Sequence, residues 1–298
     1  MNWSSYIQHW DTFVEDWLKN PISLAQNDSL LSPPFNIDDL IEIPEPYYCG
    51  TQLSEDMELD AVIVNLNPGA SAENEWVKFH CNANLPDAHM IYELSQCKSN
   101  HYQKINQLFN PLLASTLACT PGKGWWEKER LEWLDRFYPS GSRANGGYKP
   151  DKIFVLEFCP WHSKSFKLKT SALLNAKSKK HIEDYFIDPL TDAISHSHLK
   201  GGKSGEPYGL CFGKAIYDIL TKNFSFTLVK TWNSTSASVA SHWPQGSKGL
   251  IDRTYSLIEG KDSMNNPVRL LCFWYRNIGV HAPKDAFRSV EDHIKSVI

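Results

Sequence analysis

Apolar residues fall into short runs that are separated by polar stretches along the whole chain. The first such run, Ala61-Val62-Ile63-Val64-Asn65-Leu66, stops abruptly at Asn67-Pro68-Gly69. Runs of five to eight β-branched and aromatic residues are typical of strands buried on both faces, as in parallel sheets. The pattern predicts strands at 61–66, 152–159, 208–212, 224–231 and 269–275.

Other segments repeat apolar residues every three or four positions, which predicts amphipathic helices. The clearest is 3–18, where tryptophan, tyrosine and phenylalanine form one stripe. Further helices are expected at 101–118, 127–137, 171–199, 213–220 and 284–297. Strands alternating with helices predict a three-layer α/β/α domain with a mostly parallel central sheet of about four strands. This domain would span 44–298, after an acidic helical extension at 1–43.

The charge is distributed unevenly, although the net charge is only −4. Residues 1–60 hold twelve acidic side chains and one basic one, whereas residues 61–298 carry a net charge of +7. A basic body is compatible with a nucleic-acid partner, and a solvated acidic face explains the leader equally well. The sequence leaves the oligomeric state open.

Composition narrows the protein class further. No run is long enough to span a bilayer, and no basic-then-apolar signal peptide begins the chain, so we expect no membrane partner. Seven scattered cysteines without a C-x-x-C pair favour reduced thiols in a cytoplasm over a zinc or iron–sulfur framework. We therefore predict a cytoplasmic protein without a metal or organic cofactor.

Polar side chains stand where three of the predicted strands end. They are Asn65 with Asn67, Glu157 with His162, and the group Arg276, Asn277 and His281. The carboxyl ends of parallel strands meet at one edge of a sheet, so these groups are expected to converge. A carboxylate inside the strand at 152–159 is costly unless it lies at the strand end or is paired.

The segment 158–182 contains six lysines and no acidic residue. Hydroxyl side chains are interleaved with these lysines, which suits contacts with phosphate groups. A lysine-rich surface helix explains the same composition. The candidate phosphate-binding residues are Lys164, Lys167 and Lys169.

In order, these motifs resemble those of the uracil-DNA glycosylase superfamily. The family's first motif is G-x-N-P-G after a strand, and the match here is 65–69, with Asn65 in place of the glycine. Phe79 stands at the offset of the family's base-stacking phenylalanine. The second motif matches at Val155-Leu156-Glu157-Phe158-Cys159-Pro160, with Glu157 in place of a base-reading asparagine. The third motif lies at 277–283 without a close match, and the resemblance covers 44–298.

The resemblance implies a monofunctional DNA glycosylase that flips a base out of the helix and hydrolyses its N-glycosidic bond. Asn67 would position water, while His281 or Asn277 would donate a hydrogen bond to the departing base. The implied base-binding residues are Phe79, Trp76, Glu157, Asn65 and His162, and the implied DNA contacts are Lys164, Lys167, Lys169, Arg276, Ile278 and Val280. Ile278 and Val280 would fill the space that the flipped nucleotide leaves.

Glu157 is the most informative departure from the family pattern. An ionised carboxylate only accepts hydrogen bonds, so it would repel uracil O4 and favour an exocyclic amine. The hypothesis is a modified cytosine, as found in some phage DNA, which would imply a role in phage defence. The alternative is a structural carboxylate paired to an arginine or lysine. Two other functions stay open: a non-catalytic DNA- or protein-binding member of this fold, and a nucleoside or nucleotide hydrolase.

Overall fold

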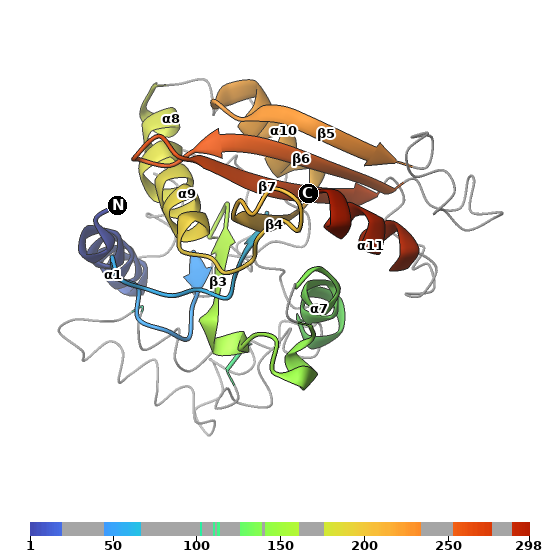
Figure 1. Cartoon of the computed structure of the whole chain (residues 1–298). Helices are drawn as coiled ribbons and strands as arrows, with labels where there is room; N and C mark the ends of the chain where they lie inside the picture. Colours follow the sequence, from blue (N-terminus) through green and yellow to red (C-terminus); the bar gives the residue numbers. More distant parts are fainter. Residues whose placement is uncertain are drawn as a thin grey trace.

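A computed structural model gives the fold, shown in Figure 1. It describes residues 1–19, 45–66, 102, 110, 112–113, 126–138, 141–160, 176–233, 253–275 and 288–298. Every structural statement below concerns these residues.

The described strands form one mixed sheet of seven strands in the order β1-β3-β2-β4-β7-β6-β5. Their bounds are β1 Tyr47–Tyr48, β2 Ala61–Asn65, β3 Ile153–Glu157, β4 Tyr208–Phe212, β5 Thr227–Asn233, β6 Arg253–Lys261 and β7 Pro267–Tyr275. The four central strands β3, β2, β4 and β7 run parallel to one another. β1 is antiparallel at one edge, and β6 and β5 are antiparallel at the other.

The α/β class and the parallel centre of the sheet are therefore confirmed, but the sheet has seven strands, and the prediction of about four was wrong. The runs at 61–66, 152–159, 208–212 and 269–275 are the four parallel strands. β6 was not predicted, because only three of its nine residues are apolar and it contains a glycine. The strand expected at 224–231 begins later, at Thr227, and pairs antiparallel with β6.

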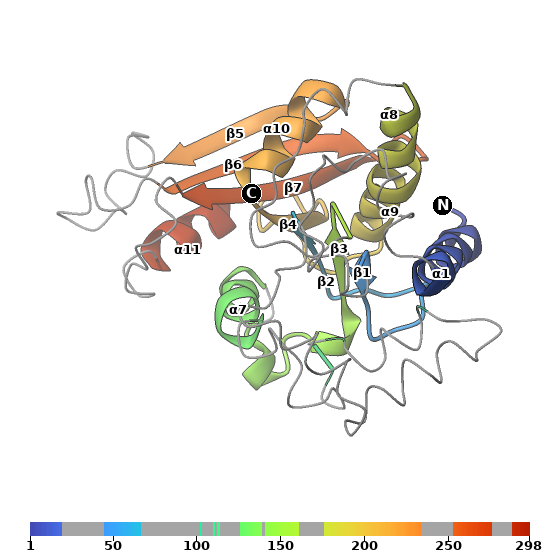
Figure 2. The same cartoon turned by 180° about the vertical axis from the view of Figure 1, so that it is seen from behind.

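Helices cover both faces of the sheet, and Figures 1 and 2 show α7 and α11 on one side and α1, α8 and α9 on the other. The helical elements are α1 Trp3–Lys19, η2 Trp126–Leu131, α7 Glu132–Phe137, η3 Arg143–Asn145, η4 Pro150–Lys152, α8 Ala176–Ile182, η6 Glu183–Ile187, α9 Asp188–Ser195, α10 Lys214–Asn223 and α11 Arg288–Val297. η2 and η6 are π-helical turns, whereas η3 and η4 are 3₁₀ turns. Layers of helix on each face of a sheet agree with the predicted three-layer arrangement.

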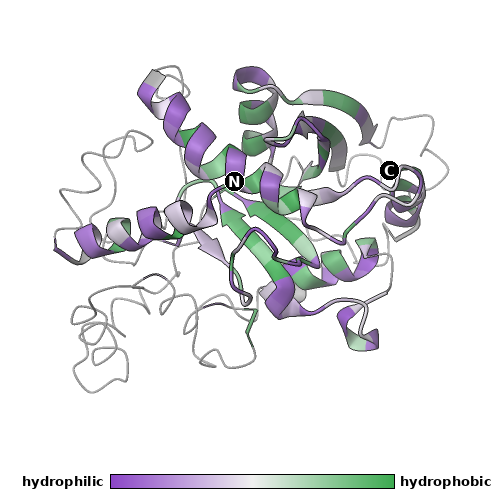
Figure 3. Cartoon of the chain, turned by 60° about the vertical axis from the view of Figure 1, so that its left-hand side comes forward, coloured by the Kyte–Doolittle hydropathy of each residue, from purple (hydrophilic) through white to green (hydrophobic). Residues whose placement is uncertain are grey.

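Alternate side chains of each central strand enter two separate apolar cores. The apolar character of the central strands is seen as green ribbon in Figure 3. Val62, Val64, Phe154 and Leu156 face the core beneath α1, α8, α9 and α10. The intervening residues of β2 and β3 face the core beneath η2, α7 and α11. A residue two positions further along a strand returns to the same face, so Asn65 and Glu157 belong to the η2 face.

α1 confirms the helix predicted at 3–18, and its aromatic stripe is core packing. Trp3, Tyr6 and Trp10 are buried, and the ring of Trp3 meets that of Phe154 edge-to-face at 5.8 Å. The Trp3 indole nitrogen also donates to Asp192 Oδ2 over 2.9 Å, which ties α1 to α9. The acidic leader thus begins with a helix that packs on the sheet face opposite η2.

The remaining helix predictions have mixed outcomes. The segments 127–137 and 213–220 are helical close to the expected bounds, and 284–297 contains α11. The segment predicted as helical over 171–199 contains α8, η6 and α9 in succession. The helix predicted at 101–118 lies almost wholly outside the described residues.

Candidate functional site at the strand ends

The chain reverses its direction of travel across the sheet next to β2. It passes from β2 to β3 on one side, and then crosses to β4 on the other side of β2. Open α/β sheets bind ligands outside the carboxyl ends of their strands at such a switch point. The last residues of these strands are Asn65, Glu157 and Phe212.

Asn65 and Glu157 stand directly opposite each other and form a hydrogen bond. They are register partners in the parallel pair, and the Asn65 amide nitrogen donates to Glu157 Oε1 over 2.9 Å. Asn65 is 6% exposed and Glu157 is 5% exposed, so the bond lies in a region of low dielectric constant. The sequence had placed these residues in two separate motifs, and the fold brings them together.

Backbone hydrogen bonds hold the end of β3 on both sides. The amide of Glu157 donates to the Pro46 carbonyl over 2.9 Å, and that of Phe158 donates to the Asn65 carbonyl over 2.9 Å. The Glu45 amide donates in turn to the Pro160 carbonyl over 2.8 Å. The Glu157 side chain therefore projects from a backbone whose position is fixed by its neighbours on each side.

Arg130 of η2 completes the arrangement from the helical layer. Its Nε donates to Asn65 Oδ1 over 3.2 Å, and its guanidinium carbon lies 4.1 Å from the centre of the Phe212 ring. The half-buried arginine therefore spans the ends of β2 and β4. Cation–π contacts of this kind contribute about 0.5–1 kcal/mol at partly exposed sites.

Arg130 was not predicted as a site residue, although its position among apolar residues in the sequence is unusual for an arginine. Arg130 follows Trp126 by four positions and precedes Trp133 by three, so it interrupts an apolar helical row. Trp133 packs against Phe273 with ring centres 4.5 Å apart. A cation on the apolar row of a helix must reach the edge of the core, which is where Arg130 meets the strand ends.

A second buried carboxylate lies beside β1. The Tyr48 hydroxyl donates to Glu45 Oε2, and Glu45 is 7% exposed. Burial raises the pKa of Tyr48 well above its usual range, and electrostatic interactions with Glu45, Tyr102 and Glu157 raise this pKa further. Tyr48 is therefore a protonated donor at neutral pH, and sequence reasoning did not include it or Glu45 among the site residues.

Of the predicted site residues, Asn65 and Glu157 are described, and they contact each other. The predicted residues outside the described part of the chain are Asn67, Trp76, Phe79, His162, Lys164, Lys167, Lys169, Arg276, Asn277, Ile278, Val280 and His281. Their roles stay predictions. Glu157 accepts a hydrogen bond from Asn65, and Arg130 donates to the amide oxygen of the same asparagine. A base-reading carboxylate and a structural carboxylate paired to an arginine or lysine both stay predictions for Glu157.

The described part of the lysine-rich segment is a surface helix. Lys177, Lys179 and Lys180 on α8 are exposed, and Lys180 forms an i,i+4 ion pair with Asp184. α8 packs on the sheet face opposite η2 and α7, and Figure 2 shows α8 and α7 on opposite sides of the sheet. These three lysines are therefore remote from the Arg130 side of the strand ends.

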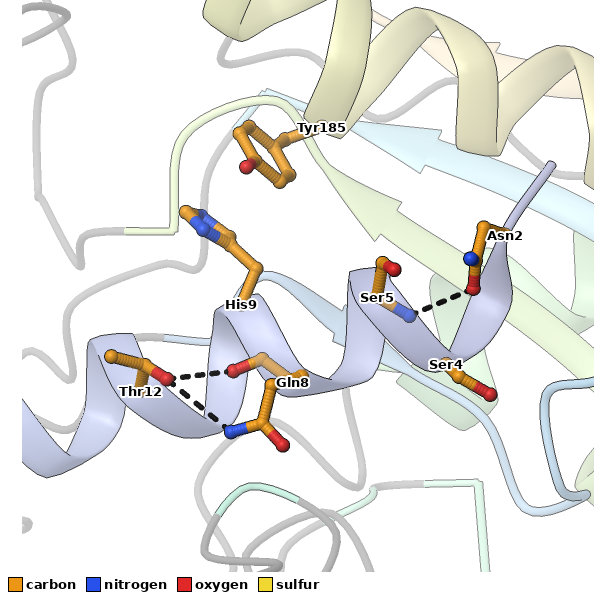
Figure 4. A pocket seen from close by; sticks show the side chains of 7 residues that line it. All are labelled: Asn2, Ser4, Ser5, Gln8, His9, Thr12 and Tyr185. Carbon is orange, nitrogen blue, oxygen red and sulfur yellow. Dashed lines mark hydrogen bonds between the residues drawn. The ribbon is translucent and has the colours of Figure 1, made fainter.

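A separate polar hollow lies between α1 and η6, and Figure 4 shows the side chains around it. Its lining consists of Asn2, Ser4, Ser5, Gln8, His9, Thr12 and Tyr185. The His9 imidazole stacks on the Tyr185 ring with centres 3.6 Å apart. Burial, and then the charge of nearby His181, lower the pKa of His9 to about 4. This lining has no carboxylate, so it lacks the acid–amide pairing found at the strand ends.

The described residues contain neither a metal-binding cluster nor a helix that could span a membrane. No group of three or more histidine, cysteine, aspartate or glutamate side chains could hold a metal ion within the described ranges. Among the described helices, none combines the length and apolarity that a membrane span requires.

In comparisons with known proteins, no protein family, no curated protein and no solved structure matches this chain.

Proposed function

We propose that this protein is a DNA glycosylase that hydrolyses the N-glycosidic bond of a flipped-out base, with a modified cytosine as the base. The observation that carries the proposal is the hydrogen bond between Asn65 and Glu157. These residues are 92 positions apart in the sequence, and they belong to two motifs that resemble the first and second motifs of the uracil-DNA glycosylase superfamily. Their meeting point is the part of an open α/β sheet where ligands bind.

The reaction needs few chemical groups. Water attacks the sugar carbon C1′, the glycosidic bond breaks, and the base leaves with the bonding electron pair while the sugar passes through an oxocarbenium-like state. Hydrogen-bond donors aimed at the departing base stabilise its developing negative charge. Asn67, two residues beyond Asn65, would orient the water, and His281 or Asn277 would donate to the base.

The buried position of Glu157 supports a base-reading role in this proposal. A carboxylate in a region of low dielectric constant discriminates strongly between donors and acceptors, because an unmatched polar group there has lost its water. Such a carboxylate accepts from the exocyclic amine of cytosine and opposes the O4 carbonyl of uracil. Excision of ordinary cytosine would damage the host genome, so the substrate would be a modified cytosine of foreign DNA, and the activity would serve phage defence.

The test is an abasic-site assay with duplexes that each contain one uracil, cytosine, 5-hydroxymethylcytosine or glucosylated hydroxymethylcytosine. After incubation with wild-type protein or Asn67→Ala, alkali cuts the strand wherever the base has been released. The expected result is cleavage at one modified cytosine by the wild type and loss of this cleavage in the variant.

Two other results would each favour a different function. Absence of cleavage on every duplex, together with salt-sensitive DNA binding, would indicate a binding protein without catalysis. Release of the base from free nucleosides but not from DNA would indicate a nucleoside hydrolase. Cleavage at uracil alone would preserve the glycosylase proposal and contradict the role given to Glu157.

A further inference from the structure

Three polar groups lie in a row across the strand ends on the η2 face. Glu157 ends β3, Asn65 ends β2, and Arg130 rests on Phe212, which ends β4. The sheet order places β2 between β3 and β4, so Asn65 is the middle member. Hydrogen bonds of 2.9 Å and 3.2 Å join Asn65 to Glu157 and to Arg130.

The chemistry of the two outer groups fixes the orientation of the Asn65 amide. A guanidinium group only donates hydrogen bonds, so Asn65 must turn its Oδ1 toward Arg130. A carboxylate accepts, so the Asn65 Nδ2 must face Glu157. This orientation agrees with the observed bonds, and it orders the row as acceptor, donor and donor from β3 toward β4.

Each member of the row is of a type that can form more hydrogen bonds than the row itself uses. The Asn65 Nδ2 has two hydrogens, of which one points to Glu157. A guanidinium group has five N–H groups, and Arg130 directs its Nε–H to Asn65. A carboxylate accepts several hydrogen bonds through its two oxygens, so the row can both hold itself together and meet a ligand.

We propose that Glu157, Asn65 and Arg130 together read the Watson–Crick edge of a flipped cytosine-type base, an inference that rests on the proposed glycosylase function. This edge presents the N4 amine as a donor, then N3 and O2 as acceptors. The row offers acceptor, donor and donor in the same order. Uracil presents O4 as an acceptor and N3–H as a donor, so it is mismatched to Glu157 and to Asn65.

The three residues have different duties in this arrangement. Glu157 and Asn65 discriminate cytosine from uracil, because the two bases differ at positions 3 and 4. Arg130 meets O2, which both bases possess, and so increases affinity for either pyrimidine. Arg130 is also a positioning residue, because its bond to Oδ1 keeps the Asn65 amide from turning over.

The Watson–Crick edge does not include carbon 5 of the base. Cytosines with a methyl, hydroxymethyl or glycosylated hydroxymethyl group at this carbon all present the same edge. The row therefore selects the cytosine class, and any discrimination among 5-substituted cytosines would come from other residues.

The experiment measures binding without catalysis. Oligonucleotides carry a single 2′-fluoroarabino-cytidine or 2′-fluoroarabino-uridine, whose fluorine suppresses breakage of the glycosidic bond, and fluorescence anisotropy gives Kd. The wild type is expected to bind the cytidine probe at least ~10-fold more tightly, since a good base contact discriminates by a factor of this order or more. This ratio requires no variant, so it tests the row even if a substitution prevents folding.

Two substitutions separate the base discrimination proposed for Glu157 from the affinity for either pyrimidine proposed for Arg130. Glu157→Gln keeps the shape and can still accept from Asn65, but it can also donate to O4, so the cytidine preference should fall toward unity. Arg130→Met should weaken binding of both probes about 10-fold, with the preference retained and the slope of log Kd against log salt unchanged. Glu259→Gln on β6, which removes the partner charge of Arg269, is the matched control.

Each remaining outcome contradicts a defined part of the account. Equal Kd values for the two probes would overturn the row, and the glycosylase proposal would survive if wild-type protein still releases a base in the abasic-site assay. A salt slope reduced by about one in Arg130→Met would identify Arg130 as a phosphate contact and remove it from the row. Absence of both base release and DNA binding would overturn the proposed function and the row together.

Discussion

Two arginines of one short helical segment meet buried carboxylates in different ways. Arg136 of α7 donates from NH1 to both oxygens of Glu291, over 2.8 Å and 3.1 Å. Arg130 of η2, six residues earlier, donates to Asn65, and Asn65 donates to Glu157. The first arrangement is a direct ion pair, and the second places a neutral amide between the charges.

The difference follows from where each arginine lies. Glu291 is fully buried on α11, and the Tyr255 hydroxyl also donates to it over 3.1 Å, so this cluster locks α11 and α7 onto the sheet. Glu157 lies at the carboxyl end of a strand beside the switch point, which is where open α/β sheets bind their ligands. In the direct pair, the two charged groups hydrogen-bond to each other. In the row from Glu157 through Asn65 to Arg130, acceptor and donor groups lie side by side. The comparison favours a role in stability for Arg136, and it agrees with the recognition role that we propose for Arg130.

Arg136→Met should give the largest effect on stability. This change removes the cation beside a carboxylate that is 0% exposed, and breaking a buried ion pair in this way costs about 3–5 kcal/mol. The measurement is the free energy of unfolding from urea titration. A loss below about 1 kcal/mol would show that Glu291 does not depend on Arg136, and would break the comparison.

Tyr255→Phe tests the second hydrogen bond to the buried Glu291 carboxylate. It removes one hydrogen bond to Glu291 and retains the ring that packs against Phe273 with centres 5.0 Å apart. A hydrogen bond to a charged group is worth about 1.5–3 kcal/mol, so the free energy of unfolding should fall by this amount and the urea midpoint should decrease. In the Arg136→Met background the two effects should not add, because both act on one carboxylate.

Glu157→Gln should have the opposite profile, with a small effect on stability and a large one on base preference. The glutamine can accept from Asn65 as the glutamate does, so the free energy of unfolding should change by less than about 1 kcal/mol. The ratio of uracil-type to cytosine-type binding should nevertheless shift ~10-fold. A loss of stability as large as that of Arg136→Met would make Glu157 a structural carboxylate.

Acidification should lower the stability of a third region, the contact between α1 and η6, where His9 stacks on Tyr185. The pKa of His9 is lowered from 6.5 to about 4, first by burial and then by the charge of His181. Between these values the unfolded chain binds a proton that the folded protein does not, so stability should fall as pH decreases from 6.5 to 4. Thermal unfolding across this range should show a shallower pH dependence in His9→Gln than in the wild type. Equal slopes in the variant and the wild type would contradict this role of His9.

The parallel half of the sheet could be predicted because both its faces are buried. Continuous apolar runs mark β2, β3 and β4 within two or three residues of their observed bounds. In the antiparallel half, β6 was missed because only three of its nine residues are apolar, although residues 255–258 are buried in the fold. The turn between β6 and β7 has Asn265 at φ 68°, a left-handed conformation that asparagine tolerates better than most residues.

The site was partly predictable for a related reason. Asn65 and Glu157 follow apolar runs, so their place at strand ends could be inferred from the sequence alone. Their mutual hydrogen bond depends on β2 and β3 being neighbours in register, which local patterns do not encode. Arg130 reaches them from a separate helical turn, a contact set by tertiary packing across 65 residues of sequence.

The central claim is that the end of β3 belongs to a base-excising site. The most direct measurement is alkali-revealed strand cutting at a single uracil, 5-hydroxymethylcytosine or glucosylated hydroxymethylcytosine, compared among wild type, Glu157→Gln and Glu259→Gln. The account predicts that wild type and Glu259→Gln cut at one modified cytosine, and that Glu157→Gln loses this activity or shifts it toward uracil. Identical cutting by all three proteins, or no cutting at any of these bases by the wild type, would contradict it.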